Sequence, residues 1–125
     1  LAPRVHILAH DASTKIFLGY TRIGKVDIGN NVFIGAESVV LPNVKIGDNV
    51  IIGANSTVSK NLASNGVYAG SPAKLICEFD YFIEKNKKKL DTGPKFNKDY
   101  TLYNIDSQRK EEMIKLLNDR DAFVI

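Results

Sequence analysis

A six-residue repeat runs between residues 28 and 58 of this chain. Written in sixes, the segment reads IGNNVF, IGAESV, VLPNVK, IGDNVI and IGANST, and the next residue is valine. Glycine holds the second position in four of these five units, and the fifth position is always small or β-branched. The first position is always aliphatic: Ile28, Ile34, Val40, Ile46, Ile52 and Val58. A fold for this chain has to bury one aliphatic side chain at every sixth residue.

A period of six fits neither an α-helix, which needs apolar residues three and four apart, nor an amphipathic strand, which alternates every second residue. It suits a chain that runs straight for a few residues, turns with the help of glycine, asparagine or aspartate, and then presents its next β-branched residue to the same interior. One short face buries very little, so successive coils must stack, as in other repeat proteins. The repeat therefore predicts a mainly β solenoid.

These repeats resemble those of the bacterial hexapeptide-repeat acyltransferases, and in particular the branch of sugar and polysaccharide O-acetyltransferases. The resemblance covers about residues 5–78 and includes the closing segment VSKNLASNGVYAGSPAKLI, which is similar to the segment with which the family leaves its repeat. It implies a left-handed parallel β-helix with three hexapeptides per coil, and the handedness comes from the resemblance alone. We therefore expect residues 1–78 to form an acyltransferase β-helix with a loop excursion at 11–25, and residues 79–125 to form a C-terminal helical extension.

The stretch HILAHDAST, residues 6–14, places two histidines four residues apart just before the repeat. If a coil consists of three hexapeptides, Ile28 lies one coil below Ile46, and one coil further back is His10, at an interior type of position. The residues that follow, 11–25, break the repeat and are expected to leave the coil wall. In the sugar O-acetyltransferases that this chain resembles, a histidine at this distance before the repeat is the catalytic base, so the resemblance implies that role for His10.

Other roles for these side chains compete with catalysis. A lone histidine is more often a packed structural residue than a catalyst, and we expect such a role for His6. Asp11 is expected to be a turn residue rather than a partner that orients His10. A catalytic zinc ion, as in the hexapeptide-repeat carbonic anhydrases, needs three protein ligands. The chain has two histidines and no cluster of cysteine or carboxylate residues to complete them, so we expect no metal.

Acetyl transfer from a thioester to a hydroxyl needs a base near the alcohol, stabilisation of the oxyanion and a grip on the acyl donor, acetyl-CoA. Neutral imidazole suits the first task because its unperturbed pKa of about 6.5 lies near working pH. We expect the acceptor oxygen to attack acetyl-CoA directly, with no acyl-enzyme, and backbone N–H groups to meet the oxyanion. Cys77, in the apolar stretch LICEF, is expected to be inert.

The resemblance also implies a binding surface for coenzyme A. It assigns five residues: Ser59, Lys60 and Lys74 around the 3′-phosphate, and Ala36 and Ala54 along the groove for the pantetheine arm. The alternative is that the lysines are ordinary surface residues and the alanines ordinary repeat residues. Relatives often carry a second basic residue three positions after Lys74, where this chain has Cys77, and this departure weakens the expected phosphate site.

The pattern changes after residue 78. FDYFIEKNKKKL predicts a helix with Asp80 available as its cap, ended by DTGPK. Residues 106–120 predict a second helix behind an Asp106 or Ser107 cap. About two coils are too few to seal both ends of a free solenoid, so we expect association. The resemblance implies a homotrimer with active sites between subunits.

Composition argues against several classes of partner. The chain has 125 residues, 44% of them hydrophobic, and a formal net charge of +3. Positive and negative residues are nearly balanced in both halves, which disfavours a nucleic-acid partner. No apolar run reaches the ~18 residues that stable membrane insertion requires. A single cysteine and no recognisable export leader indicate the reducing cytoplasm.

Together these features predict an acetyl-CoA-dependent O-acetyltransferase that acts on the hydroxyl of a sugar or polysaccharide precursor, in the synthesis of a surface polysaccharide. Two alternatives stay open. One is a non-catalytic β-helix scaffold that only trimerises, and the other is an N-acetyltransferase whose acceptor is an amino sugar.

Overall fold

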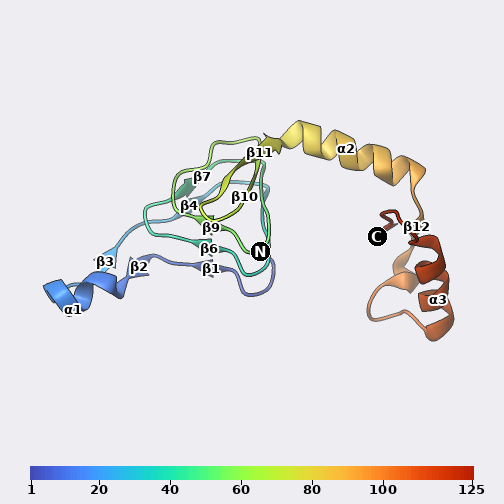
Figure 1. The fold of residues 1–125 in the computed structure, drawn as a ribbon, viewed down its shortest axis with the longest axis horizontal. Coiled ribbons are helices and arrows are strands. Elements are labelled where there is room, and N and C mark those ends of the chain that lie inside the picture. The colour runs from blue at the N-terminus through green and yellow to red at the C-terminus, as the bar shows by residue number, and fades with distance from the viewer. The chain divides into compact units, whose positions relative to one another are not determined.

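The computed structural model describes all 125 residues, Leu1–Ile125, which divide into two compact units, Leu1–Phe82 and Ile83–Ile125. The first unit holds three columns of short parallel strands, stacked in coils (Figure 1). The columns are β1 (His6–Ile7), β6 (Val39–Val40) and β9 (Thr57–Val58); β4 (Asp27–Ile28) and β7 (Lys45–Ile46); and β5 (Val32–Ile34), β8 (Val50–Ile52) and β10 (Gly66–Ala69), with β11 (Lys74–Glu78) antiparallel to β10. The predicted hexapeptide-repeat β-helix followed by C-terminal helices is confirmed.

Successive rungs of each column pair first-position residues of the repeat. Ile28 pairs with Ile46, and Val40 pairs with Val58, in each case three hexapeptides further along the chain. One coil therefore consists of three hexapeptides, as predicted. These aliphatic side chains fill the interior, and five of the six are at most 1% exposed: Ile34, Val40, Ile46, Ile52 and Val58. Ile28 stays 37% exposed, because β4 pairs with β7 on one side only.

Asparagine side chains stabilise one corner of the coils. Asn31, Asn49 and Asn65 have positive φ values of 54°, 54° and 62°, a conformation that asparagine adopts more readily than most residues. Asn31 Nδ2 donates to Asn49 Oδ1 at 3.1 Å, and Asn49 Nδ2 donates to Asn65 Oδ1 at 3.0 Å. At another corner, a Cβ on Gly35 would lie 2.5 Å from the backbone nitrogen of Ala54. The asparagine and glycine positions of the repeat thus permit the close spacing of the coils.

The first coil is interrupted by an insertion, residues 10–24, which we call the arm. The chain leaves the coil after Ala9 and returns at Gly24, whose amide donates to the Ala9 carbonyl at 2.8 Å. As a result the step along the chain from His6 to its partner Val39 is longer than the three hexapeptides that separate Val40 from Val58. The arm contains β2 (His10–Asp11), η1 (Ala12–Thr14), α1 (Lys15–Leu18) and β3 (Arg22–Ile23). β2 and β3 pair antiparallel, and Figure 1 shows the arm projecting from the coils.

The interior position predicted for His10 is wrong. Counting one full coil back from Ile28 assumes an unbroken coil, but the coil wall passes directly from Ala9 to Gly24. His10 instead lies at the root of the arm, where it pairs with Ile23 and is exposed.

The second unit is small and has little interior. α2 (Phe79–Thr92) leads into it and is followed by β12 (Lys95–Phe96), η2 (Lys98–Tyr100), α3 (Ser107–Leu116) and β13 (Phe123–Val124). β12 and β13 pair in parallel. Phe96 is the one buried residue of this unit, 8% exposed, and its ring centroid lies 4.9 Å from that of Tyr100.

The two predicted helices exist, and one of their two caps is as predicted. The Asp106 side chain caps α3 by accepting a hydrogen bond from the Arg109 amide at 2.8 Å. Asp80 does not cap α2, because that helix already begins at Phe79 and Asp80 lies in its first turn. None of the helices combines the length and the apolar character needed to cross a bilayer.

Candidate active site at the root of the arm

His10 is exposed at the point where the arm leaves the coil. Its imidazole has no hydrogen-bond or ion-pair partner within the chain. Both ring nitrogens are therefore available to a bound molecule. A base that exchanges a proton with a substrate needs this kind of accessibility.

Two open hollows meet at His10. One, of about 630 Å³, is lined by Ala9, His10, Ile23, Gly24 and Lys25. The other, of about 340 Å³, is lined by Leu8, His10, Asp11, Ala12, Arg22, Leu41 and Pro42. One imidazole thus borders two separate spaces, which suits a base that serves a reaction between two substrates.

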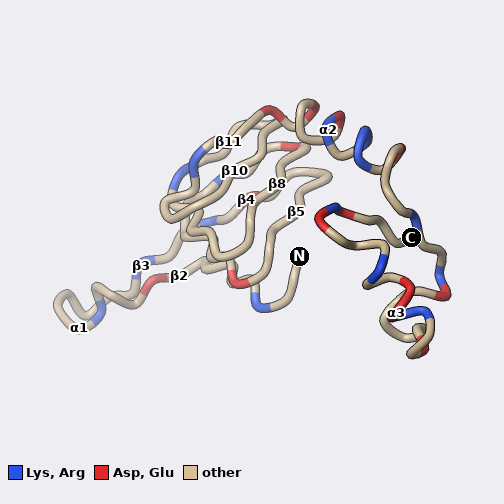
Figure 2. Tube along the Cα trace, turned by 45° about the vertical axis from the view of Figure 1, so that its right-hand side comes forward, with Lys and Arg blue, Asp and Glu red and all other residues tan.

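Asp11 is held by neighbours other than His10. Its Oδ1 accepts a hydrogen bond from the Ser13 amide at 2.9 Å, and its Oδ2 accepts one from an Arg22 guanidinium nitrogen at 2.8 Å. Hydrogen bonding by Ser13, first through its amide and then through its side chain, lowers the pKa of Asp11, and the charge of Arg22 lowers it further. In Figure 2 an acidic stretch of the trace is red beside the label β2, and a basic stretch is blue beside the label β3. The prediction that Asp11 is a turn residue is confirmed, since it caps η1.

Ala36 and Ala54, the alanines expected to line the groove for the pantetheine chain of coenzyme A, lie one above the other and away from His10. Ala36 and Ala54 follow β5 and β8 at the same corner of adjacent coils. The Asn55 amide donates to the Ala36 carbonyl at 2.8 Å, which keeps the two coils in register there. Ala36 is half-buried and Ala54 is exposed. Neither alanine lines a hollow beside His10 in the same chain.

The residues expected around the 3′-phosphate lie at the C-terminal end of the β-helix. Ser59 and Lys60 follow β9, and Lys74 begins β11. All three are exposed, and neither lysine has an ion-pair or hydrogen-bond partner. Ser59 and Lys60 occupy the corner one coil beyond Leu41, whose amide donates to the Val58 carbonyl at 3.0 Å. Leu41 lines the smaller hollow, whereas Ser59 and Lys60 do not.

Sequence reasoning missed the charged residues that flank His10. Arg22 lines the smaller hollow and Lys25 the larger one, and Lys25 Nζ lies 2.8 Å from Asp27 Oδ1. One signal could have found them. The two ends of an insertion must meet where it leaves the coil, so residues just before the repeat resumes have to lie beside residues 9–11.

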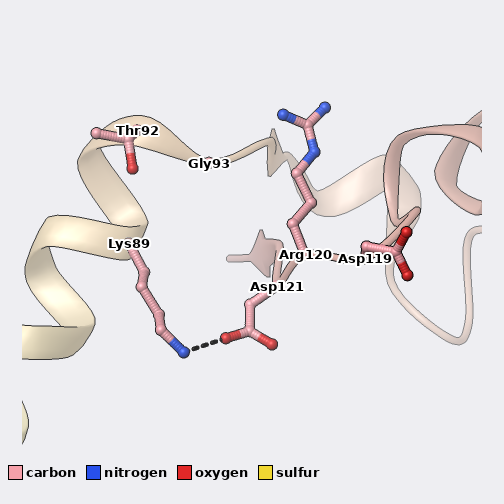
Figure 3. Close-up of a pocket in the computed structure, with 6 residues that line it drawn as sticks. All are labelled: Lys89, Thr92, Gly93, Asp119, Arg120 and Asp121. Atoms are coloured by element: carbon pink, nitrogen blue, oxygen red, sulfur yellow. Dashed lines mark hydrogen bonds and ion pairs between the residues drawn. The ribbon is translucent and has the colours of Figure 1, made fainter.

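The second unit contains two other hollows, and neither includes a histidine or a cysteine. Figure 3 shows the first, of about 470 Å³, lined by Lys89, Thr92, Gly93, Asp119, Arg120 and Asp121. Lys89 and Asp121 form an ion pair across it, and Arg120 Nε donates to the Leu116 carbonyl at 2.9 Å. The second hollow is apolar and is lined by Leu90, Lys95, Phe96, Asn97, Phe123, Val124 and Ile125. Nowhere in the structure do three side chains of histidine, cysteine, aspartate or glutamate lie together so that they could hold a metal ion.

Comparison with known proteins points to a transferase family. The family described as bacterial transferase hexapeptide (six repeats) matches residues 25–60. The protein CapG of Staphylococcus aureus is 43% identical over an alignment of 97 residues that covers 74% of this chain and 56% of CapG.

Two solved structures have similar folds. A maltose O-acetyltransferase from Clostridium difficile 630 is 37% identical, with a TM-score of 0.54, and the match covers 59% of this chain and 41% of that one. A galactoside acetyltransferase in complex with coenzyme A is 36% identical, with a TM-score of 0.60, and the match covers 67% of this chain and 44% of that one. This chain thus spans about half the length of the relatives it matches.

Proposed function

Because the chain belongs to the hexapeptide-repeat acetyltransferase family, we propose that it is an acetyl-CoA-dependent O-acetyltransferase whose acceptor is a sugar hydroxyl. The observation that carries this proposal is His10, an exposed and unpartnered imidazole that borders two hollows at the root of the arm. The two solved relatives named for maltose and galactoside acetylation support a sugar acceptor. We further propose that the product enters a surface polysaccharide, and that the protein works in the cytoplasm, where its free Cys77 stays reduced.

In the proposed reaction His10 acts as general base. A ring nitrogen accepts the proton of the acceptor hydroxyl while the acceptor oxygen attacks the thioester carbonyl carbon of acetyl-CoA. A C–O bond forms and the C–S bond breaks as the tetrahedral intermediate collapses. The proton held by His10 then passes to the leaving thiolate, which departs as the free thiol of coenzyme A. No acyl-enzyme is needed, because both substrates can meet beside one imidazole.

The donor would be held by groups that the single chain leaves free. Lys60 and Lys74 are exposed and unpaired, so both can neutralise the phosphates at the adenosine end, with Ser59 as a neighbouring hydroxyl donor. The small side chains of Ala36 and Ala54 would let the pantetheine chain of coenzyme A approach the protein backbone. Since these alanines do not line the hollows of His10, we propose that the donor surface of one copy faces His10 of another, in a homotrimer.

The test is coenzyme A release from acetyl-CoA by the full chain, measured with a panel of neutral sugars and amino sugars. His10→Ala should lower kcat by about 10²- to 10⁴-fold, the usual contribution of a positioned general base. His6→Ala is the matched control, because His6 is also exposed and also lies in a two-residue strand. This control should keep the activity of the unmodified protein.

Three other results would each point elsewhere. Absence of coenzyme A release with every acceptor would favour the non-catalytic scaffold. Release with amino sugars alone would identify an N-acetyltransferase. Equal losses in the two histidine variants would remove His10 from its proposed role.

A further inference from the structure

Few contacts hold the arm that carries His10 in place, and most of them lie within the arm itself. β2 and β3 contain two residues each, and beside them the Gly24 amide donates to the Ala9 carbonyl. Further out, Thr14 Oγ1 donates to the Tyr20 carbonyl at 2.8 Å. None of the side chains in η1 and α1 is buried. Because the outer part of the arm buries no side chain, the contacts at its root must set the direction in which it leaves the coil.

One side-chain pair spans that root. Asp11 and Arg22 face each other in the β2–β3 ladder, next to the pairing of His10 with Ile23. Their ion pair has an N–O distance of 2.8 Å, and the side chain of Asp11 is 31% exposed. The other carboxylate oxygen of Asp11 accepts the Ser13 amide, so the same side chain joins β2 both to β3 and to the turn that follows. Both oxygens of Asp11 are occupied by these two donors, and neither donor is His10.

We propose that Asp11 and Arg22 are positioning residues for His10, which their ion pair fixes at the root of the arm. This inference rests on the proposed role of His10 as base. Asp11 then acts through the backbone of β2 and through Arg22, and not by accepting a hydrogen bond from the imidazole. The distinction matters because a displacement of about 1 Å at a reacting group can cost ~10²-fold in rate. An ion pair that sets the position of the imidazole, as this clamp of Asp11 and Arg22 does, can therefore control kcat.

The test compares Asp11→Asn, Arg22→Gln and the double variant in the full chain. Each single variant should lower kcat by about 10- to 100-fold with little change in the KM for acetyl-CoA, because the donor surface lies elsewhere. The double variant should lose no more than either single one, since both remove the same ion pair. The reversed pair, Asp11→Arg with Arg22→Asp, should regain part of the rate but not all, because it lacks the acceptor for the Ser13 amide.

The control is Arg4→Gln, which removes another exposed ion pair of the same unit. Arg4 Nε lies 2.6 Å from Glu37 Oε1 and neither residue lines a hollow of His10. This variant should keep the kcat of the unmodified protein. A loss comparable to that of Arg22→Gln would show a general effect on folding and would overturn the positioning role.

Amide hydrogen exchange supplies a second readout that does not depend on activity. If the clamp holds the root, exchange in residues 10–24 should accelerate in Asp11→Asn and in Arg22→Gln, while exchange in residues 45–58 stays unchanged. Unchanged exchange in the arm, or a loss of kcat in Asp11→Asn alone, would overturn the proposal in favour of direct contact between Asp11 and His10. If the unmodified protein releases no coenzyme A while both variants still loosen the arm, the clamp exists and it is the proposed function that fails.

Discussion

At the scale of single residues, the state of the clamp can be read from the titration of Asp11. The amide of Ser13, then the side chain of Ser13, and then Arg22 lower the pKa of its carboxyl group from the ordinary 3.8. Because the folded pKa lies below that of the unfolded chain, the carboxylate contributes stability above about pH 4, and this contribution is lost as the pH falls through the lowered folded value. The contribution of Asp11 to stability therefore changes with pH only in acidic solution and stays constant near neutral pH.

We therefore predict that the carboxyl carbon of Asp11, followed by NMR, titrates with a midpoint below 3.8. Arg22→Gln should move this midpoint upward by only part of the shift, because the Ser13 amide is the larger cause. The difference in unfolding free energy between the unmodified protein and Asp11→Asn should shrink as the pH is lowered through that midpoint. A midpoint that does not respond to Arg22→Gln would show that the two side chains do not pair in solution.

At the scale of elements, the rungs of the β-helix could be predicted in detail because their signal is local and repeated. An aliphatic residue every sixth position, with three units to a coil, predicts that Ile28 pairs with Ile46, as observed. The cap of α3 could likewise be predicted, since Asp106 lies next to the helix it caps. These are cases in which each side chain has the same role in every coil, or acts within a single turn of its position in the sequence.

Other elements could not be predicted, because their pairing depends on an insertion or on distant partners. The antiparallel pairing of His10 with Ile23 exists only because the arm folds back on itself, and a count of three hexapeptides across the arm misplaces His10. The pairing of β12 with β13 joins two short strands that lie on opposite sides of α3 in the sequence and show no periodicity. The candidate site could be predicted only in part, since the resemblance implies a role for His10 but no sequence pattern pointed to Arg22 or Lys25.

The asparagine corner gives a prediction about the coils. Asn49 donates to one asparagine and accepts from another, so Asn49→Ala removes two side-chain hydrogen bonds and also places alanine at a φ of 54°. Asn55→Ala is the matched control, because Asn55 has a φ of 55° and no side-chain hydrogen bond. Asn49→Ala should be the less stable variant by about 1–3 kcal/mol, the worth of two modest hydrogen bonds. Equal midpoints in urea denaturation would show that the ladder adds nothing beyond backbone conformation.

At the scale of the whole molecule, several large apolar side chains of the arm are open to water, as is typical of surfaces that bind a partner. Ile16, Phe17 and Tyr20 are 88%, 84% and 81% exposed. A second copy that covers this surface would also supply what the hollows of His10 lack, namely the residues proposed to bind the donor, which do not line these hollows in the same chain. Assembly and catalysis are then expected to fail together.

Light scattering should accordingly find a trimer, and the double variant Ile16→Ser with Phe17→Ser should shift it towards monomers while removing the activity. Tyr103→Ser is the control, because Tyr103 is 95% exposed but lies in the second unit. It should leave both the trimer and the activity in place. A monomeric unmodified protein with full activity would contradict the proposed assembly.

Mixing two inactive variants tests whether each site is shared between copies. His10→Ala lacks the base but keeps the donor surface, whereas Lys60→Glu with Lys74→Glu keeps the base but repels the phosphates of the donor. Suppose that each site takes its base from one copy and its donor surface from the next. When the two variants are co-refolded in equal amounts, the copies at each interface are chosen at random, so about a quarter of the interfaces combine an intact base with an intact donor surface. About a quarter of the sites should then be active. If base and donor surface belong to the same copy, every mixed trimer contains only defective sites, and coenzyme A release stays at the level of the separate variants.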